Sequence, residues 1–290
     1  MAMRERIEHL PGSKIREVAN AGLGRSDVLA FWFGESDEVT PEAVRQAAVA
    51  SLTAGETFYS HNLGLMELRE SLAAYISRWH RPLGADRIAV TSSGVSALMV
   101  AQQLLVDPGD EVVAVVPVWP NLTAQAQILS AQLRRVSLQP GPDGQWKLDL
   151  QALLAAITPS TRLLLINAPN NPTGWCLSPD EQRAILAHCR RTGTWILADE
   201  VYERIWFGSG ATAPSFLDHA EPEDRLIVAH SFSKSFLMTG WRLGWLVMPS
   251  ACLASVGKLL EFNTSCAPVF VQRAGLEALA QAESLVPHIL

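Results

Sequence analysis

The chain has 290 residues, of which 48% are hydrophobic, so it can bury a substantial core as one large domain or two smaller ones. Its formal net charge is −6 at pH 7 and no long run of basic residues occurs, which argues against nucleic acid as a partner. No apolar stretch approaches the roughly 18 residues that would predict a membrane span, and the charged N-terminus lacks the apolar region of a secretory signal.

The four cysteines have no CxxC spacing, so we expect neither a zinc site nor a disulfide framework. Cysteines without such a pattern are typical of buried thiols in a reducing compartment. The sequence therefore predicts a soluble, cytoplasmic protein.

The N-terminal part of the chain carries few regular patterns. Residues 1–40 are expected to be irregular. Thr40 is then expected to cap a helix that has Pro41 at its first position and is stopped by Gly55. After a polar loop, large aliphatic residues at helical spacing within 65–76 predict a second helix of about 15 residues.

From residue 88 onward, short apolar runs alternate with helical segments. The expected strands are 88–91, 112–116, 163–167, 195–199, 226–230 and 244–248. Expected helices end near Val106 and Gly193, the latter starting at a capping box of Ser178 and Glu181, and others cover 121–130 and 268–282. Because the strands are apolar throughout, both faces of the sheet are expected to be buried, which predicts a mainly parallel α/β sheet with helices on both faces.

Polar and aromatic residues follow the strands at their carboxyl ends, where open α/β sheets place their chemistry. Ser93 and Gly94 end one strand and open a helix, which suits an anion site but equally an ordinary helix cap. Trp119 follows the next strand and is either a plate for a planar ring or a packing residue. Asn171, in NNPTG, has turn chemistry as its alternative.

A carboxylate ends a buried strand at Asp199, with Tyr202 shortly after it. Burying a carboxylate is costly unless it is paired, so this position favours a cationic partner.

A lysine flanked by hydroxyl residues, Lys234, follows the 226–230 run. It is either a solvated loop lysine or a Schiff-base lysine whose amine becomes nucleophilic when its pKa is lowered. Ser231, Ser233 and Arg242 nearby would suit a phosphate dianion, with the arginine acting through paired N–H donors.

Taken together and in this order, SSG, the tryptophan, NPTG, D-x-x-Y, S-x-S-K and the later arginine resemble the class I/II aminotransferase family of fold type I pyridoxal-phosphate enzymes. The resemblance runs from about residue 12 to the C-terminus and includes TPEAVRQAA, GLMELRESLA and DPGDEV. It implies pyridoxal 5′-phosphate as cofactor, no metal, transfer of an amino group between an amino acid and a 2-oxo acid, and a homodimer. It also implies that residues 1–40 form an N-terminal arm and part of a small domain, and that 41–290 form the large, cofactor-binding domain.

The resemblance implies a role for each matching residue. Lys234 would hold the cofactor aldehyde as a Schiff base and then move the proton between substrate and cofactor as general base and acid. Asp199 would keep the pyridine nitrogen protonated, while Tyr202 and Asn171 would hydrogen-bond the phenolic oxygen.

Other matching residues would hold the phosphate and shape the site. The implied phosphate donors are Ser93, Gly94, Val95, Ser231, Ser233 and Arg242. Trp119 would stack on the ring, Tyr59 would reach the phosphate of the neighbouring subunit, and Gly34 would line the substrate side.

One departure concerns the substrate. The family carries the arginine that holds the substrate α-carboxylate in a C-terminal part of the small domain, and no counterpart occurs before Leu290. We therefore expect a complete cofactor site with an incomplete small domain, in a truncated version of a longer enzyme rather than a protein that has lost amino-acid binding. Such a chain is expected to bind the cofactor but to transaminate poorly.

Other functions are left open by the sequence. A carbon–sulfur β-lyase uses the same cofactor residues, and a non-catalytic cofactor-binding remnant would retain them. A nucleotide-binding enzyme is the weakest alternative, because GSGATA at 208–213 neither follows a clear strand nor opens a clear helix. Which amino acid is used is also left open.

Overall fold

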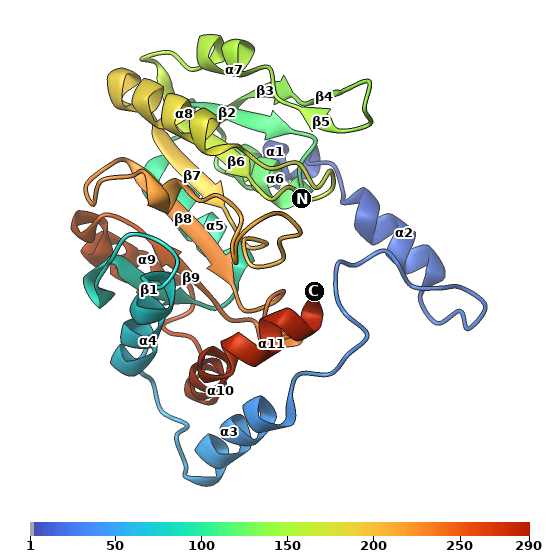
Figure 1. Cartoon of the computed structure of the whole chain (residues 1–290), viewed down its shortest axis with the longest axis vertical. Helices are drawn as coiled ribbons and strands as arrows, with labels where there is room; N and C mark the ends of the chain where they lie inside the picture. The colour runs from blue at the N-terminus through green and yellow to red at the C-terminus, as the bar shows by residue number, and fades with distance from the viewer. Residues whose placement is uncertain (1–2) are drawn as a thin grey trace.

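The computed structural model describes residues 3–290 and is built on one seven-stranded sheet (Figure 1). Its strands, in the order in which they pair, are β1 (Ile88–Thr91), β9 (Gly244–Val247), β8 (Leu226–Ser231), β7 (Trp195–Asp199), β6 (Thr161–Asn167), β2 (Glu111–Val116) and β3 (Gln132–Ser137). In this sheet of the described chain, β9 alone runs in the direction opposite to the other six strands. The predicted mainly parallel sheet is confirmed.

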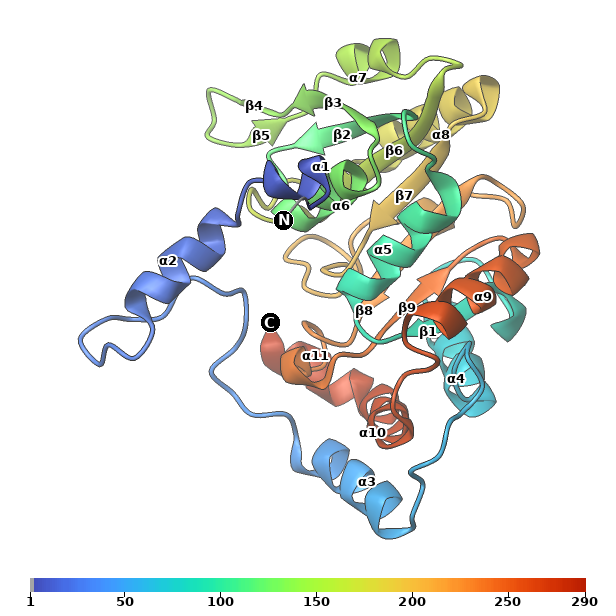
Figure 2. The ribbon, with the colours of Figure 1, turned by 180° about the vertical axis from the view of Figure 1, so that it is seen from behind.

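Helices cover both faces of this sheet. On one side lie α4 (Met66–Ile76), α7 (Leu150–Ala156), α8 (Pro179–Thr192) and α10 (Val269–Ala280), and on the other α5 (Gly94–Leu105), α6 (Pro120–Ile128) and α9 (Leu253–Asn263) (Figures 1 and 2). Successive strand residues alternate between the two apolar cores: Val113 belongs to the first and Val112 to the second. The central strands are apolar throughout because each of their faces is buried in one of these two cores.

The expectation that residues 1–40 are irregular is wrong, because two helices form there: α1 (Glu5–Glu8) and α2 (Lys14–Gly22). Ser13 caps α2 by accepting a hydrogen bond from the N–H of Arg16 at 3.3 Å. The helix projects from the body of the molecule in Figure 1, and most of its side chains are exposed. Its apolar residues Ile15, Val18 and Ala19 stand at helical spacing, but the helix is short and mostly polar, so this pattern is a weak signal in the sequence.

Thr40 does not cap the helix that follows it. Helix α3 (Glu42–Thr53) starts after Pro41 and has no side-chain cap. The Thr40 hydroxyl instead donates to the carbonyl of Leu237 at 2.5 Å and accepts from the indole N–H of Trp241 at 2.9 Å. Thr40 therefore ties the N-terminal segment to the loop that follows Lys234.

The other predicted helices differ mainly in their ends. Helix α4 has 11 residues rather than about 15, since it begins after the N-cap Leu65 and ends before the C-cap Ser77. The capping box of Ser178 and Glu181 is present, and Gly193 ends α8 with a left-handed φ of 76°. A last helix, α11 (Ala282–Ile289), follows α10, and a two-stranded ribbon joins β4 (Gln139–Pro140) to β5 (Trp146–Lys147). Within residues 3–290, no helix is long and apolar enough to cross a membrane.

Candidate active site

The lysine predicted to be reactive, Lys234, lies in the turn after β8. Its amine donates a hydrogen bond to the carbonyl of Gly34, 200 residues earlier in the chain. A Cβ atom on Gly34 would lie 3.6 Å from this amine and 3.8 Å from the hydroxyl of Tyr202. The structure therefore brings Lys234, Gly34 and Tyr202 together around one point.

Burial lowers the pKa of the Lys234 amine, and the nearby Arg242 charge lowers it further, against the opposing charges of Glu35 and Asp199. A lowered pKa leaves more of the lysine as the neutral amine, which is the nucleophilic form. The surroundings of Lys234 are thus those of a reactive rather than a solvated lysine.

Asp199, the last residue of β7, is only 5% exposed. Its carboxylate accepts a long hydrogen bond, 3.4 Å, from the N–H of Val201, and no salt bridge to it occurs among residues 3–290. Burial raises the pKa of Asp199 to about 7, although Val201 and the charge of Lys234 act against this rise. A buried carboxylate with so few partners fits a ligand that brings a protonated nitrogen to it.

Tyr202 and Asn171 approach the same region from two different loops. The side-chain amide of Asn171 lies 3.5 Å from the hydroxyl of Tyr202, at the limit of a hydrogen bond. Burial, and then the charge of Asp199, raise the pKa of Tyr202, so its hydroxyl stays protonated and can donate. The backbone N–H of Trp119, the N-cap of α6, donates to the backbone carbonyl of Asn171 at 2.8 Å.

Hydroxyl and guanidinium groups gather beside the lysine. The Ser231 hydroxyl lies 2.9 Å from that of Ser233, and Arg242 reaches the Ser233 hydroxyl at 3.4 Å. Arg242 has a left-handed backbone, with φ 56°, and also donates to the carbonyl of Thr239 at 2.6 Å. Such a set of donors suits a phosphate dianion.

The start of α5 adds backbone donors to this group. Ser93 caps the helix by accepting from the N–H of Ser96 at 3.0 Å. Gly94 lies against β8, since a Cβ on it would come within 3.0 Å of the Cβ of Ser231. The first N–H groups of a helix, here those of Gly94 and Val95, have no carbonyl partner in a preceding turn and favour an anion.

Tyr59 is the one predicted site residue that lies apart from this group. It is 87% exposed in the loop between α3 and α4, beside Phe58, which is 84% exposed. A cavity of about 870 Å³ next to the donor group is lined by Arg242, Ser92 and Arg45, together with other residues. Within one chain, then, Tyr59 does not join the donor group.

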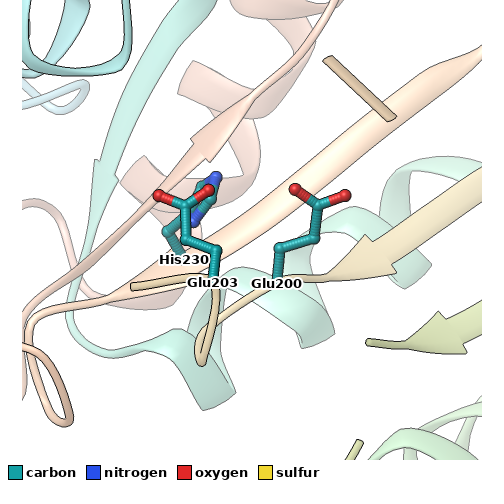
Figure 3. A group of neighbouring side chains, drawn as sticks. All are labelled: Glu200, Glu203 and His230. Atoms are coloured by element: carbon teal, nitrogen blue, oxygen red, sulfur yellow. The ribbon is translucent and has the colours of Figure 1, made fainter. Parts of the chain in front are cut away.

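Sequence reasoning missed a buried polar cluster behind the site. Figure 3 shows Glu200, Glu203 and His230, whose side-chain oxygen and nitrogen atoms lie within 4.8 Å of one another. Each is a chain neighbour of a predicted site residue. For His230 in β8 and Glu200 directly after β7, such neighbours point to opposite faces of the sheet, whereas Glu203 lies in the turn that follows. That alternation was the signal that could have revealed the cluster.

The spacing of these three groups could hold a metal ion, but the carboxylates already have partners in the chain. Glu200 accepts from the Ser215 hydroxyl at 2.5 Å and from the N–H of Phe216 at 3.0 Å. Glu203 is hydrogen-bonded to His80 at 3.2 Å. The two carboxylates therefore belong to internal hydrogen-bond networks, whereas Nε2 of His230 has no hydrogen-bond partner among residues 3–290.

Comparison with known proteins assigns the family. The family model "Aminotransferase class I and II" matches residues 27–288. The aspartate aminotransferase of Pyrococcus horikoshii is 33% identical over 281 residues, covering 97% of this chain and 71% of that relative. The aspartate aminotransferase of Thermotoga maritima is 34% identical over 280 residues, covering 94% of this chain and 73% of the relative.

Solved structures agree with the sequence relatives. A crystal structure of the Thermotoga maritima aspartate aminotransferase has a TM-score of 0.90 and 32% identity, covering 98% of this chain and 76% of that chain. The chain belongs to the class I and II aminotransferase family. It is a transaminase that depends on pyridoxal 5′-phosphate, so the predicted family, fold class, activity and cofactor are confirmed.

Proposed function

We propose that the chain moves an amino group between an amino acid and a 2-oxo acid, with Lys234 as the residue that holds the cofactor and transfers the proton. The observation that carries this proposal is the convergence of Lys234, Tyr202 and Gly34 beside a buried Asp199 that lacks a salt bridge within residues 3–290. When bound, pyridoxal 5′-phosphate supplies an aldehyde that condenses with amines and a ring that accepts electrons from the substrate α-carbon.

The chain's own groups would act in two ways. The Lys234 amine, its pKa lowered by burial, would take the proton from the substrate α-carbon and return it on the cofactor side. Asp199 would hold a proton on the ring nitrogen, and Tyr202 and Asn171 would donate to the phenolic oxygen. Together these groups would hold the ring at its nitrogen and its phenolic oxygen while the proton moves.

Three segments would bind the phosphate: the turn after β8, Arg242 and the N-terminus of α5. Hydroxyl groups, a guanidinium and helix N–H groups supply charge-assisted hydrogen bonds without a titrating base. Trp119, held by the carbonyl of Asn171, would stack on the ring.

A homodimer is part of the proposal. Tyr59 and Phe58 are exposed in one chain, and the cavity beside Arg242 could receive such side chains from a second copy. The aspartate and aromatic-amino-acid transferases among the relatives support amino acids and 2-oxo acids as substrates. The cytoplasmic location and the domain division at residue 40 stay predictions from the sequence.

Borohydride reduction followed by mass spectrometry tests the assignment. We expect the reduced adduct on Lys234, and its absence in Lys234→Ala. An adduct on another lysine would overturn the assignment. Addition of aspartate to the loaded protein should yield the 2-oxo acid, whereas release of pyruvate and ammonia from a sulfur amino acid would support the β-lyase instead.

A further inference from the structure

The side chain of Asn167 connects the segments that carry the site. It is uncharged, and it contacts Asp199 and Asn171 through their backbones. Asn167 is the last residue of β6, is 1% exposed, and lies opposite Asp199 in the parallel pairing of β6 with β7. Its amide N–H donates to the backbone carbonyl of Asp199 at 2.9 Å. Its amide oxygen accepts from the backbone N–H of Asn171 at 2.8 Å.

These bonds continue beyond Asn167. The carbonyl of Asn171 accepts from Trp119, and the Asn171 side chain approaches the hydroxyl of Tyr202 at 3.5 Å. A continuous hydrogen-bonded path therefore joins Asp199, Asn171 and Trp119, which come from β7, the loop after β6 and the start of α6. Within residues 3–290, Asn167 is the only side chain of this path that is hydrogen-bonded to the backbone of two segments, β7 at Asp199 and the loop after β6 at Asn171.

We propose that Asn167 is a positioning residue that fixes Asp199 relative to Asn171, so that Asp199 would meet the ring nitrogen of the cofactor while Asn171 meets its phenolic oxygen. This inference rests on the proposed roles of Asp199 and Asn171. A primary amide suits the position because it presents a donor and an acceptor on one rigid plane. A carboxylate would lose the donor. An aliphatic side chain would leave the N–H of Asn171 without this acceptor and the carbonyl of Asp199 with only the backbone N–H of Ala168, at 3.2 Å.

The chain offers a matched control for the strand pairing alone. Thr194 is 0% exposed and lies just before β7, at the opposite end of the same two strands. Its hydroxyl donates to the carbonyl of Thr161 in β6 at 3.0 Å. Thr194→Val therefore removes this buried hydrogen bond to β6, together with one to the Thr192 hydroxyl at 2.8 Å, far from the site while keeping the shape of the side chain.

The test compares Asn167→Ala, Asn167→Asp and Thr194→Val with the wild type, each loaded with pyridoxal 5′-phosphate. We expect both Asn167 variants to shift the pH midpoint of the bound cofactor's absorbance change by about one unit and to weaken cofactor binding roughly tenfold, on the scale of one lost hydrogen bond. Thr194→Val should keep the wild-type midpoint and affinity.

Two outcomes overturn the inference. One is a folded Asn167 variant with the wild-type midpoint and affinity, and the other is an equal shift in Thr194→Val. If Asn167→Ala does not fold, Asn167→Asp, which retains the acceptor for Asn171, decides the question. Borohydride reduction separates this inference from the proposed function: an adduct on Lys234 with an unchanged midpoint defeats the inference alone, whereas absence of that adduct in the wild type defeats the proposed function.

Discussion

Asp199 and Glu203 are two carboxylates that are equally buried, each 5% exposed, yet they have different partners. Glu203 is hydrogen-bonded to His80 at 3.2 Å, and the other ring nitrogen of His80 is hydrogen-bonded to Asp218 at 2.7 Å. Asp199 has no salt bridge within the described chain. Burial raises the pKa of Glu203, but His230 and His80 outweigh it and lower the pKa overall, whereas the pKa of Asp199 is raised to about 7.

The difference separates a group that stabilises the fold from one kept ready for a ligand. A buried charge is costly, so it persists with a partner in the chain or where binding supplies one. Glu203 has the first arrangement and holds the turn that bears Tyr202 against the segment that follows α4. Asp199 has the second, and the protonated ring nitrogen of the cofactor would complete it. Substitutions around Glu203 should therefore change the free energy of unfolding, whereas substitutions of Asp199 should change turnover.

The largest effect is expected for Asp199→Ala. Turnover with aspartate should fall roughly 10²- to 10³-fold, because loss of one electrostatic group costs a few kcal/mol of transition-state stabilisation. The free energy of unfolding without cofactor should stay equal or rise, because an unpaired buried carboxylate is removed. Single-turnover kinetics and urea unfolding measure the two quantities. Near-normal turnover, or a marked loss of stability in the cofactor-free chain, would show that Asp199 is not a carboxylate kept for the ligand.

His80→Asn should act in the opposite way. We expect a loss of roughly 3 kcal/mol in the free energy of unfolding near pH 6, since a buried charged partner of two carboxylates is removed, while the cofactor absorbance is retained. Burial lowers the pKa of His80, but hydrogen bonds to Asp218 and Glu203 outweigh it and raise the pKa from 6.5 to about 10. This stabilisation is complete below the unfolded pKa and is lost as pH rises through the folded one.

Urea unfolding from pH 6 to pH 10 checks that dependence, and the loss caused by His80→Asn should shrink across the range. The matched control is His288→Asn, because His288 pairs with Glu38 at 2.9 Å but its side chain is 63% exposed. An exposed pair contributes little, so this variant should unfold like the wild type. A loss in His80→Asn that does not change with pH would rule out the charged pairing.

The cofactor site and the pair of His80 with Glu203 also differ in how far the sequence predicts them. The residues around Lys234 and Arg242 lie in one short segment, and Asp199 directly ends an apolar strand, so local patterns indicate them. His80 and Glu203 are 123 residues apart, and neither stands in a pattern that names the other. Only the folded chain brings them together, because their pairing depends on how the segment after α4 lies against the turn that bears Glu203 and the segment that bears Asp218.

The same reasoning explains the misassigned elements. Strand β3, at the edge of the sheet, has the sequence QLRRVS and is mostly exposed, so the apolar runs that mark the central strands do not reveal it. Thr40 has the residue type and position of a helix cap, but a tertiary contact with Leu237 and Trp241 takes its hydroxyl instead. Local preference predicts which groups need partners, while the packing decides which partners they find.

A smaller effect is expected for Arg242→Gln. Removing the guanidinium should weaken cofactor binding roughly 10- to 100-fold, the range for a hydrogen bond to a charged group, with little change in turnover at saturating cofactor. Equilibrium dialysis or fluorescence titration measures the affinity. Arg190→Gln is the control, since Arg190 pairs with Asp224 through two hydrogen bonds away from the site. Equal affinities for the two variants would remove Arg242 from the phosphate site.

The smallest effect is expected for Tyr59→Phe, which removes one hydroxyl. Because this side chain is 87% exposed in a single chain, the substitution should leave the stability of the fold unchanged. In the proposed homodimer the hydroxyl would reach the partner's phosphate, so its loss should weaken cofactor binding about fivefold, within the range of one neutral hydrogen bond.

A hybrid dimer tests whether Tyr59 acts across the interface. One subunit carries Tyr59→Phe and keeps Lys234, while the other carries Lys234→Ala and keeps Tyr59, so the single site that can form a borohydride adduct depends on the partner for that hydroxyl. We expect this site to titrate with wild-type affinity, because the intact tyrosine of the second subunit completes it. If Tyr59 served its own chain instead, the same site would bind the cofactor as weakly as the Tyr59→Phe homodimer. That result would show that the cofactor site does not need the tyrosine of a second copy.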